Sequence, residues 1–596
     1  MERVADYIIN RLAEQNIKHI FLITGRGILY LTDAVAKNPN ITAVSAYHEQ
    51  GASYAAMAYA SASDGMSACL VSTGCAATNA VTAALCAYQD NLPVVFISGQ
   101  NMLRETTGYT GVPIRTYGSQ EADIVPIVSS VTKYAVMLSN ADDVAYELDK
   151  AIYLANSARK GPVWIDVPLD IQNARIEPAQ LRRFTPPEER FAPDNADVAY
   201  AVEQYRAASR PILFVGGGVR SAGAAQEVQA LSQQLQLPVV FSTSAADVYG
   251  IGNALSIGAV GSLGGSRAGN FAVQNADLIL AVGSKLCSQT TGNPDQFGRA
   301  AKVIAVDIDS SEHTKQGVAF ERVICADAKA FLSAFLLQSL PPVDSTWTER
   351  CLHWKEQFAL SAEDFVKELK QQNKIDLYQF ADALSSALPE QATVITDAGF
   401  EELIIPSAVR YHGQQRCLFP ASQGAMGYAI PAIIGAHYAG RRDIVCVVGD
   451  GSIMMNLQEL QIIAAHQIPA KIFAINNNMY AVIRKRQKDL FRARTIGNDP
   501  SDGVPAPDFC KIAACFGLKY CSIPTLTELS DQLTAVLSAS GPCLCEVSCT
   551  EDQKYFHTSF ALNEKRRLVK RPLEDLSPFL GRELFRKEML IEPIEE

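Results

Sequence analysis

The fold is decided by the stretch Ile444-Val445-Cys446-Val447-Val448-Gly449-Asp450-Gly451-Ser452 and by a second stretch, Ile472-Phe473-Ala474-Ile475-Asn476-Asn477. Each contains an apolar run that predicts a buried strand, and residues 457–466 between them are helix-like. Asp450 and Asn477, 27 positions apart, therefore follow the carboxyl ends of two strands. In open α/β sheets, ligands bind at that edge.

A carboxylate and an amide at this edge predict a site for a hard divalent cation. Mg²⁺ prefers oxygen ligands and keeps part of its shell for phosphate oxygens. Asp450, the side-chain oxygen of Asn477 and the backbone carbonyl near Met479 supply three such oxygens. The alternative is a pair of tight turns in a Rossmann-like sheet that holds no metal.

Length and composition restrict the class of protein. A chain of 596 residues predicts about three domains. The net charge of −11 argues against a general nucleic-acid binder. The longest uncharged stretch, residues 65–89, is broken by Ser, Thr, Gly and Asn, so we expect no membrane span. The charged start predicts no signal peptide, and fourteen cysteines without a Cys-x-x-Cys pair predict reduced thiols in a cytoplasmic protein.

Helix and strand patterns alternate along most of the chain, which predicts an α/β fold with three doubly wound parallel-sheet domains. We expect the domains at residues 1–180, 192–340 and 375–548, followed by a C-terminal arm at residues 549–596. Polar, Pro-rich stretches at 184–190 and 340–344 are typical of linkers.

The Gly-Asp-Gly-Ser and Asn-Asn motifs at this spacing resemble the signature of enzymes that use thiamine diphosphate. The resemblance implies a pyrimidine-binding domain, a middle domain and a diphosphate-binding domain, in that order. In this family a Glu of the first domain reaches the cofactor held by a partner chain and favours its reactive imino tautomer. Glu49, in Tyr47-His48-Glu49-Gln50-Gly51-Ala52, matches that residue. A homodimer is then the minimum assembly, with a tetramer as the larger option.

The same resemblance assigns further cofactor contacts. Ser422 to Pro431 matches the segment whose bulky side chain bends the cofactor, with Met426 in that position and Gly424 beside it; a core Met is the alternative. Asp397 and Gly399 match the turn that meets the diphosphate. Gly449, Gly451 and Ser452 are the remaining expected contacts, with Ser452 donating to a phosphate oxygen.

Two segments of the first block narrow the resemblance to acetolactate synthases. Residues 72–79 match a loop over the pyrimidine, and residues 119–134 match the substrate side, where Gln120 is the expected contact of a donor carboxylate or carbonyl. The middle block resembles the FAD-binding domain of this family, with Gly216, Gly217, Gly218 and Asp307 at strand ends. Relatives bind FAD, ADP or nothing there; we expect FAD, with an empty site as the alternative.

The sequence departs from that pattern in two places. Arg486 stands where acetolactate synthases have a Trp, and Ser119 stands where they have a Phe. Both changes predict a larger or more polar pocket. The basic run from Arg484 to Arg494 is either a solvated helix face or a site for a phosphate-bearing acceptor. This run and the stretch 570–580 resemble a subgroup tied to branched-sugar and surface polysaccharide biosynthesis.

We therefore predict a carboligase that uses thiamine diphosphate and Mg²⁺. It would decarboxylate a 2-oxo acid, with pyruvate as the expected donor, and transfer the acyl unit to a carbonyl acceptor such as a keto nucleotide sugar. The alternatives are an acetolactate synthase that condenses two 2-oxo acids, and a simple decarboxylase or oxidase. A regulatory partner without activity is a non-enzyme alternative. A nicotinamide dehydrogenase is disfavoured because no Gly-x-Gly-x-x-Gly follows the first strand.

Overall fold

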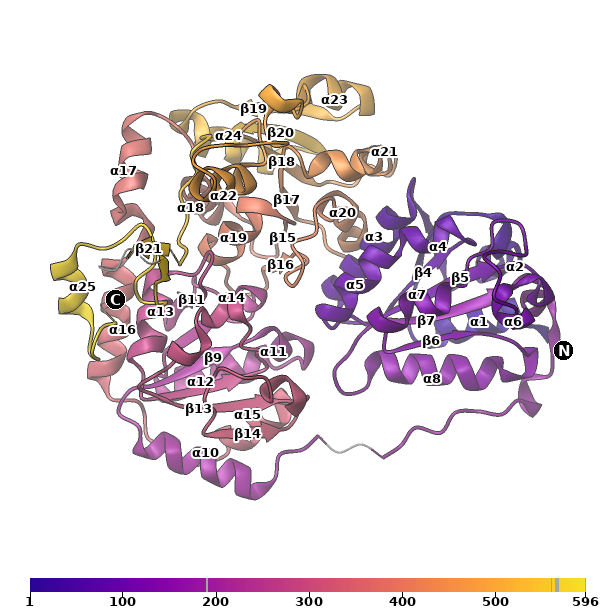
Figure 1. The fold of residues 1–596 in the computed structure, drawn as a ribbon, viewed down its shortest axis with the longest axis horizontal. Helices are drawn as coiled ribbons and strands as arrows, with labels where there is room; N and C mark the ends of the chain where they lie inside the picture. Colours follow the sequence, from indigo (N-terminus) through magenta and orange to yellow (C-terminus); the bar gives the residue numbers. More distant parts are fainter. Residues whose placement is uncertain (189–190, 559, 563–567, 595–596) are drawn as a thin grey trace.

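The computed structural model describes residues 1–188, 191–558, 560–562 and 568–594 of the chain. Three six-stranded sheets dominate it, and every strand pair within them is parallel. Helices cover both faces of each sheet, so the strands are apolar throughout (Figure 1). The predicted class, three doubly wound parallel-sheet domains, is confirmed. The predicted linker residues 189 and 190 lie outside the described residues.

The first sheet is formed by the amino-terminal part of the chain. Across the sheet its strands are β3 (Thr42–Ser45), β2 (His19–Leu22), β4 (Ser67–Val71), β5 (Val94–Gln100), β7 (Val163–Pro168) and β6 (Tyr134–Met137). Its principal helices are α1 (Val4–Glu14), α2 (Leu29–Lys37), α3 (Glu49–Ser63), α5 (Val81–Gln89) and α8 (Val144–Asn156). A two-stranded ribbon, β1 (Glu2–Arg3) with β8 (Arg175–Ile176), joins the two ends of this domain.

The third sheet repeats the first strand for strand. Its order is β16 (Arg416–Leu418), β15 (Thr393–Ile395), β17 (Ile444–Gly449), β18 (Lys471–Asn476), β20 (Cys543–Ser548) and β19 (Lys519–Ile523). Its principal helices are α18 (Leu377–Ala387), α19 (Gly399–Ala408), α20 (Ala429–Tyr438), α21 (Leu460–Ala465), α22 (Ala481–Leu490), α23 (Phe509–Phe516) and α24 (Leu526–Ser538). Each strand of one sheet therefore has a positional counterpart in the other.

The middle sheet has the order β11 (Ser256–Ala259), β10 (Val239–Phe241), β9 (Pro211–Val215), β12 (Leu278–Val282), β13 (Lys302–Asp307) and β14 (Arg322–Cys325). Its principal helices are α10 (Asn195–Ala207), α12 (Ala225–Leu235), α13 (Arg267–Asn275), α15 (Ala328–Leu336) and α16 (Ser345–Gln357). Its buried residues form one hydrophobic cluster with part of the third domain, so these two domains share a core.

Helices α3 and α20 join the first and third domains (Figure 1). They follow the equivalent strands β3 and β16, and both are rich in Ala and Gly. A side chain at Gly435 would place its Cβ 2.1 Å from the Ala55 carbonyl oxygen, so only glycine allows this approach. The buried residues around the two helices form a second hydrophobic cluster that contains side chains of both domains.

The C-terminal arm packs on the middle domain. Leu573, Leu576 and Phe585 of the arm belong to that domain's hydrophobic cluster. Glu574 pairs with Arg299 at 2.7 Å, and Glu588 of helix α25 (Arg582–Glu588) accepts from Trp354 Nε1 at 3.1 Å. These charged side chains of the arm therefore make buried contacts with the middle domain. A short two-stranded ribbon, β21 (Phe560–Leu562) with β22 (Leu568–Lys570), precedes these residues in the chain.

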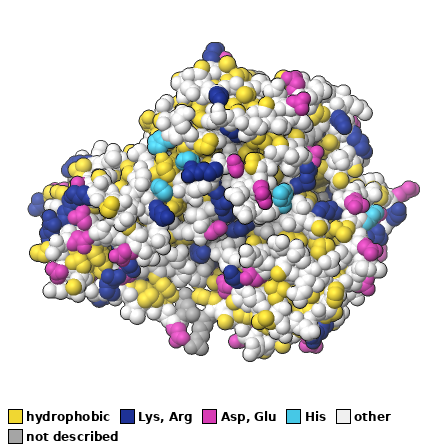
Figure 2. All heavy atoms as spheres, turned by 180° about the vertical axis from the view of Figure 1, so that it is seen from behind, with side chains coloured by type: hydrophobic (Ala, Val, Ile, Leu, Met, Phe, Trp, Pro, Cys, Tyr) yellow, Lys and Arg dark blue, Asp and Glu magenta, His cyan; other side chains and the backbone are white. Residues whose placement is uncertain are grey.

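Charged and apolar side chains are interspersed on the face shown in Figure 2, as the mixed composition of the chain implies. Within the described residues, none of the helices combines the length and hydropathy needed for a membrane span.

Candidate active site

Asp450 lies where the sequence places it, directly after β17 and next to the end of β18. Its side chain is 4% exposed, and Oδ2 accepts the backbone N–H groups of Asn477 at 3.1 Å and Asn478 at 2.6 Å. Burial raises the pKa of Asp450 to about 6 even though these N–H groups favour the anion. A bound cation would restore the carboxylate form, because an opposite charge lowers a carboxyl pKa.

Asn477 provides the second predicted ligand. Its Oδ1 is buried and has no hydrogen-bond partner within the described part of the chain. A buried amide oxygen without a partner is costly unless something not present in the polypeptide binds it. Asp450 Oδ2 fixes the turn that carries Asn477, and Met479 follows it in a buried position. This donor set of carboxylate and amide oxygens fits a hard divalent cation such as Mg²⁺.

Asp397 has a different orientation from the one that its predicted role suggests. Its carboxylate is fully buried and points into the third domain, where Oδ2 accepts Ser452 Oγ at 2.6 Å and the N–H groups of Gly427 and Ala429 at 3.2 Å. Asp397 therefore holds together the turns after β15, β16 and β17. Gly399, with φ of 78°, begins α19, whose free N–H groups at the same edge suit a phosphate group.

Glu401 and Glu402 in the first turn of α19 were not predicted from the sequence. Burial raises the pKa of each to about 8, and the nearby Asp397 acts in the same direction. The raised pKa values favour the protonated form of both groups near neutral pH, which reduces the repulsion of an anion at this helix end. A Cβ on Gly424 would lie 2.2 Å from Glu402 Oε2, so a side chain there would displace this carboxyl group, whereas a Cβ on Gly449 would be in ordinary contact with Glu401 Oε1 at 3.5 Å. Of these two predicted glycines, close packing therefore requires only Gly424.

Met426 lies between Gly424 and Gly427, whose φ angles of 54° and 84° make a turn that favours glycine. Its side chain is half-buried and belongs to none of the hydrophobic clusters among the described residues. The alternative of an ordinary core Met therefore does not apply. A half-buried apolar side chain on a fixed turn fits the predicted role of supporting a bent cofactor.

Glu49 begins helix α3, and its Oε2 accepts Asn79 Nδ2 at 2.9 Å. His48 caps the helix, because its ring Nδ1 accepts the Gln50 N–H at 3.1 Å. Next to Glu49, Gln50 Oε1 accepts Asn456 Nδ2, which also donates to the Gly427 carbonyl at 2.9 Å. One asparagine side chain thus connects the Glu49 segment to the Met426 turn within a single chain.

Glu459 anchors the same segment from the third domain. It is fully buried, and its carboxylate accepts the Tyr47 N–H at 3.0 Å and the His48 N–H at 3.1 Å. Burial raises the pKa of Glu459 to about 7. A Glu in an apolar helical stretch is the signal that could have identified it, because a buried carboxyl group needs a partner.

The predicted helix at residues 457–466 differs at its start. Residues Ile453–Glu459 form a 3₁₀ segment, and α21 begins only at Leu460. Asn456 interrupts the helical backbone with φ of −134°, because its side chain is bonded to the first domain and to Gly427. The first three residues of the expected helix thus belong to the 3₁₀ segment, directly after Asn456, which joins two parts of the site.

Gln120 lies on an exposed loop beside the 72–79 loop. Its φ of 61° is in the left-handed region, and its carbonyl oxygen would lie 2.1 Å from a Cβ on Gly74. The two loops that the sequence assigned to the pyrimidine and the substrate therefore contact each other.

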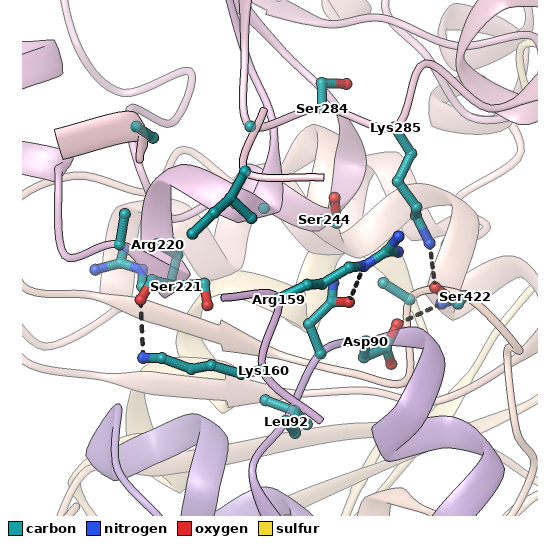
Figure 3. Close-up of a pocket in the computed structure, with 18 of the residues that line it drawn as sticks. Asp90, Leu92, Arg159, Lys160, Arg220, Ser221, Ser244, Ser284, Lys285 and Ser422 are labelled. Carbon is teal, nitrogen blue, oxygen red and sulfur yellow. Dashed lines mark hydrogen bonds between the residues drawn. The ribbon is translucent and has the colours of Figure 1, made fainter. Parts of the chain in front are cut away.

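The middle domain forms a cavity of about 540 Å³ with the other two domains (Figure 3). Gly217, Gly218 and Asp307 line it, whereas a Cβ on Gly216 would lie 2.2 Å from the Gly283 carbonyl. The basic residues in the cavity have protein partners: Arg159 pairs with Glu312 at 2.5 Å, and Lys285 donates to Ser422 Oγ at 2.8 Å. The volume and the mixed lining fit a nucleotide such as FAD.

The basic run forms α22 and the turn after it. Arg484 is paired with Asp499 at 2.8 Å, whereas Arg486, Arg492 and Arg494 are exposed. A small cavity of about 150 Å³ lies between Met479, α22 and residues 551–554, and its lining is of mixed charge. The basic members are Arg484, Lys485, Lys488 and Lys554, and the acidic members are Asp489, Glu551 and Asp552. This cavity lies next to the predicted metal loop.

Comparisons with known proteins agree with this geometry. Residues 2–127 match the thiamine pyrophosphate enzyme N-terminal TPP binding domain, residues 198–335 the central domain, and residues 397–547 the C-terminal TPP binding domain. Acetolactate synthase of Arthrospira platensis is 30% identical over 577 residues, which cover 92% of this chain and 94% of that protein. The large subunit of acetolactate synthase isozyme 2 from Escherichia coli K12 is 31% identical over 562 residues, covering 92% and 95%.

The fold and the three matched domains define an enzyme that uses thiamine diphosphate. The chain belongs to the thiamine diphosphate-dependent acetolactate synthase-like family.

Proposed function

We propose that this protein is a carboligase that decarboxylates a short 2-oxo acid, with pyruvate as the donor, and joins the remaining acyl unit to a second 2-oxo acid. The observation that carries the proposal is the buried Asn477 Oδ1 beside Asp450, which finds no hydrogen-bond partner among the residues that the structure describes, next to a turn bonded to the Glu49 segment. Relatives named acetolactate synthase, similar over most of this chain, support the choice of a 2-oxo acid as acceptor.

Each residue has a distinct role in this proposal. When bound, thiamine diphosphate supplies an electron sink for the carbon–carbon bond that breaks when CO₂ leaves. Asp450, Asn477 and the Met479 carbonyl would hold Mg²⁺. Glu49 would hold a proton for the cofactor, Met426 would support the cofactor, and Gln120 would orient the donor.

The assembly and the second cofactor are also proposals. We infer a homodimer as the minimum and allow a tetramer from the family resemblance alone, in which the Glu that matches Glu49 acts on the cofactor of a partner chain; the bonds that connect the Glu49 segment to the Met426 turn lie within one chain. FAD is the proposed occupant of the middle-domain cavity, where Asp307 would accept hydroxyl groups and Gly217 and Gly218 would let the backbone approach the nucleotide. An absorbance spectrum of the purified protein tests this, since flavin absorbance bands report FAD directly.

A keto nucleotide sugar is the second candidate acceptor. One observation favours it: Lys488 lines the small cavity beside Met479 and Arg486 of α22 is exposed, while the other basic residues of the cavity, Arg484, Lys485 and Lys554, are paired with acids. Guanidinium groups match phosphate oxygens in geometry. The similarity of this run and of residues 570–580 to the polysaccharide subgroup supports the same candidate.

Mass spectrometry of the products separates these proposals. Pyruvate alone, with thiamine diphosphate and Mg²⁺, should give acetolactate if the acceptor is a 2-oxo acid. A product that appears only when a keto nucleotide sugar is added would favour the second candidate. Free acetaldehyde or oxygen consumption would favour a decarboxylase or an oxidase. No consumption of any 2-oxo acid would contradict the proposal.

A further inference from the structure

A buried carboxylate lies inside the first domain, away from the cofactor residues. Asp166 on β7 is 1% exposed and faces the neighbouring strand β5. Its Oδ1 accepts Ser98 Oγ at 2.6 Å, and its Oδ2 accepts Gln100 Nε2 at 3.2 Å. Trp164 Nε1 donates to Ser98 Oγ at 2.8 Å, which leaves the Ser98 hydroxyl hydrogen for Asp166. The carboxylate is thus the common acceptor of a closed polar network.

The network ends on the loop that carries Gln120. Gln100 Nε2 also donates to the Ala122 carbonyl at 2.9 Å, and Asn101 Nδ2 donates to the Ser119 carbonyl at 2.9 Å. These two bonds bracket Gln120. The side chain of Gln100 is fixed from its other end too, because its Oε1 accepts the Asn101 N–H at 3.0 Å.

Gln120 needs such a restraint. Its left-handed backbone is unfavourable for a residue with a side chain, and its loop is exposed, so the conformation persists only if the surroundings impose it. Restraints on the loop include these two amide bonds, from Gln100 at the end of β5 and from Asn101 after it, and the contact of the Gln120 carbonyl with Gly74. The neighbouring Glu121 carboxylate adds bonds from the N–H groups of Thr107 and Tyr117.

An equivalent network exists in the third sheet. Glu546 on β20, the counterpart of β7, accepts Asn476 Nδ2 at 2.7 Å at the end of β18, the counterpart of β5. Asn476 Oδ1 in turn accepts the Asn478 N–H at 3.0 Å, beside the metal ligand Asn477. In both sheets an acid on one strand orients an amide at the end of the next strand, and that amide fixes a functional loop.

We propose that Asp166 is a positioning residue for the donor 2-oxo acid, acting through Gln100 and Asn101 on the loop 117–123 that presents Gln120. This inference rests on the proposed function, because it takes Gln120 as the donor contact. Asp166 itself touches neither substrate nor cofactor. Replacing its carboxylate by an amide leaves either Ser98 or Gln100 without an acceptor, and the loop then loses its fixed geometry.

The Asp166→Asn variant tests the proposal. We expect KM for pyruvate to rise about tenfold while kcat changes less than about threefold. The half-saturating concentrations of thiamine diphosphate and Mg²⁺ should be unchanged. In a Gln120→Ala background the same substitution should cause no further rise in KM, because a residue that acts only through Gln120 loses its effect when Gln120 is gone. Additive effects in the two backgrounds would overturn the proposal.

Two further variants serve as comparison and control. Asn101→Ser removes the bond to Ser119 without altering Asp166, and it should also raise KM for pyruvate. This variant provides the test if Asp166→Asn fails to fold. Glu546→Gln is the matched control, and it should raise the Mg²⁺ requirement but leave KM for pyruvate unchanged.

Hydrogen exchange of loop 117–123 gives a readout that needs no activity. We expect faster exchange there in Asp166→Asn than in the wild type, with exchange at residues 477–479 unaltered. Unchanged loop exchange would contradict the positioning role even in an active enzyme. If the wild type consumes no 2-oxo acid, and loop 117–123 still exchanges faster in Asp166→Asn than in the wild type, the proposed function is contradicted but the restraint of the loop by Asp166 is not.

Discussion

The first and third sheets have the same strand order but opposite chemistry at their carboxyl edges. After β4 the first domain has Ser72-Thr73-Gly74, whereas after the equivalent β17 the third has Gly449-Asp450-Gly451. After β5 it has Asn101, where the third has Asn477 after β18. The acids Asp397, Glu401 and Asp450 all belong to the third domain.

This difference shows that the shared topology places a binding site at the carboxyl edge of each sheet, and that the side chains at that edge determine which ligand binds. Acidic and amide oxygens suit a cation and its diphosphate, whereas hydroxyl and amide groups suit an uncharged ring. In the proposed site, Glu49 at the start of α3 is the acid that the first domain contributes. The packing of α3 against α20 then brings the two edges together.

The largest expected loss of activity comes from removing Glu49, the acid of the first domain. Glu49→Gln keeps the shape and the Asn79 bond but cannot exchange a proton with the cofactor, so kcat should fall by about 10²–10⁴-fold. Steady-state kinetics at saturating cofactor measure this. Asn79→Ala is the control for the lost hydrogen bond alone, and it should cost much less. Unaltered turnover in Glu49→Gln would remove the first domain from the chemistry.

The contact between the two halves is tested at Gly435. A Cβ there would overlap the Ala55 carbonyl, so Gly435→Ala should destabilise the fold by about 1–3 kcal/mol, as overpacked cores do. Urea unfolding midpoints measure the loss. At Gly581 an added Cβ meets nothing within 4 Å, so Gly581→Ala is the matched control. Equal stability of the two variants would mean that α3 and α20 do not pack as described.

The buried acids predict a smaller, pH-dependent effect. The pKa values of Asp166 and Glu459 are raised to about 7 and that of Glu401 to about 8, because burial disfavours the charged form. In the unfolded chain these groups lose their protons near pH 4. Between about pH 4 and 8 the folded state therefore binds more protons, and the stability of the cofactor-free protein falls as pH rises.

Unfolding midpoints at pH 5.5 and 8 measure this dependence. Each group contributes on the order of 1 kcal/mol per pH unit within its own window. Glu459→Gln keeps an acceptor for the Tyr47 and His48 N–H groups but does not titrate, so it should reduce the difference between the two pH values. A midpoint that does not change with pH would show that these acids are not buried in solution.

The sequence predicted those parts of the site that depend on local pattern. Asp450, Asn477 and the glycines around them follow apolar strands, so their edge could be inferred from the strand pattern alone. Glu459, Asn456 and Asn79 could not, because their partners lie far away along the chain: Glu459 binds residues 411 and 412 positions earlier. The inward orientation of Asp397 was missed for the same reason.

The C-terminal arm shows the same limit. The sequence predicted the arm itself, but not that Glu574 and Glu588 are buried against the middle domain. Burial of a charge depends on which partner the fold brings to it, and composition does not contain that information.

The central claim is that the two edges form one cofactor site whose metal is held by Asp450 and Asn477. Calorimetric titration of the protein with thiamine diphosphate, with and without Mg²⁺, tests it most directly. We expect binding by the wild type only when Mg²⁺ is present, and at least tenfold weaker binding by Asn477→Leu. Binding of equal strength in both proteins, or by the wild type without any divalent cation, would contradict the account.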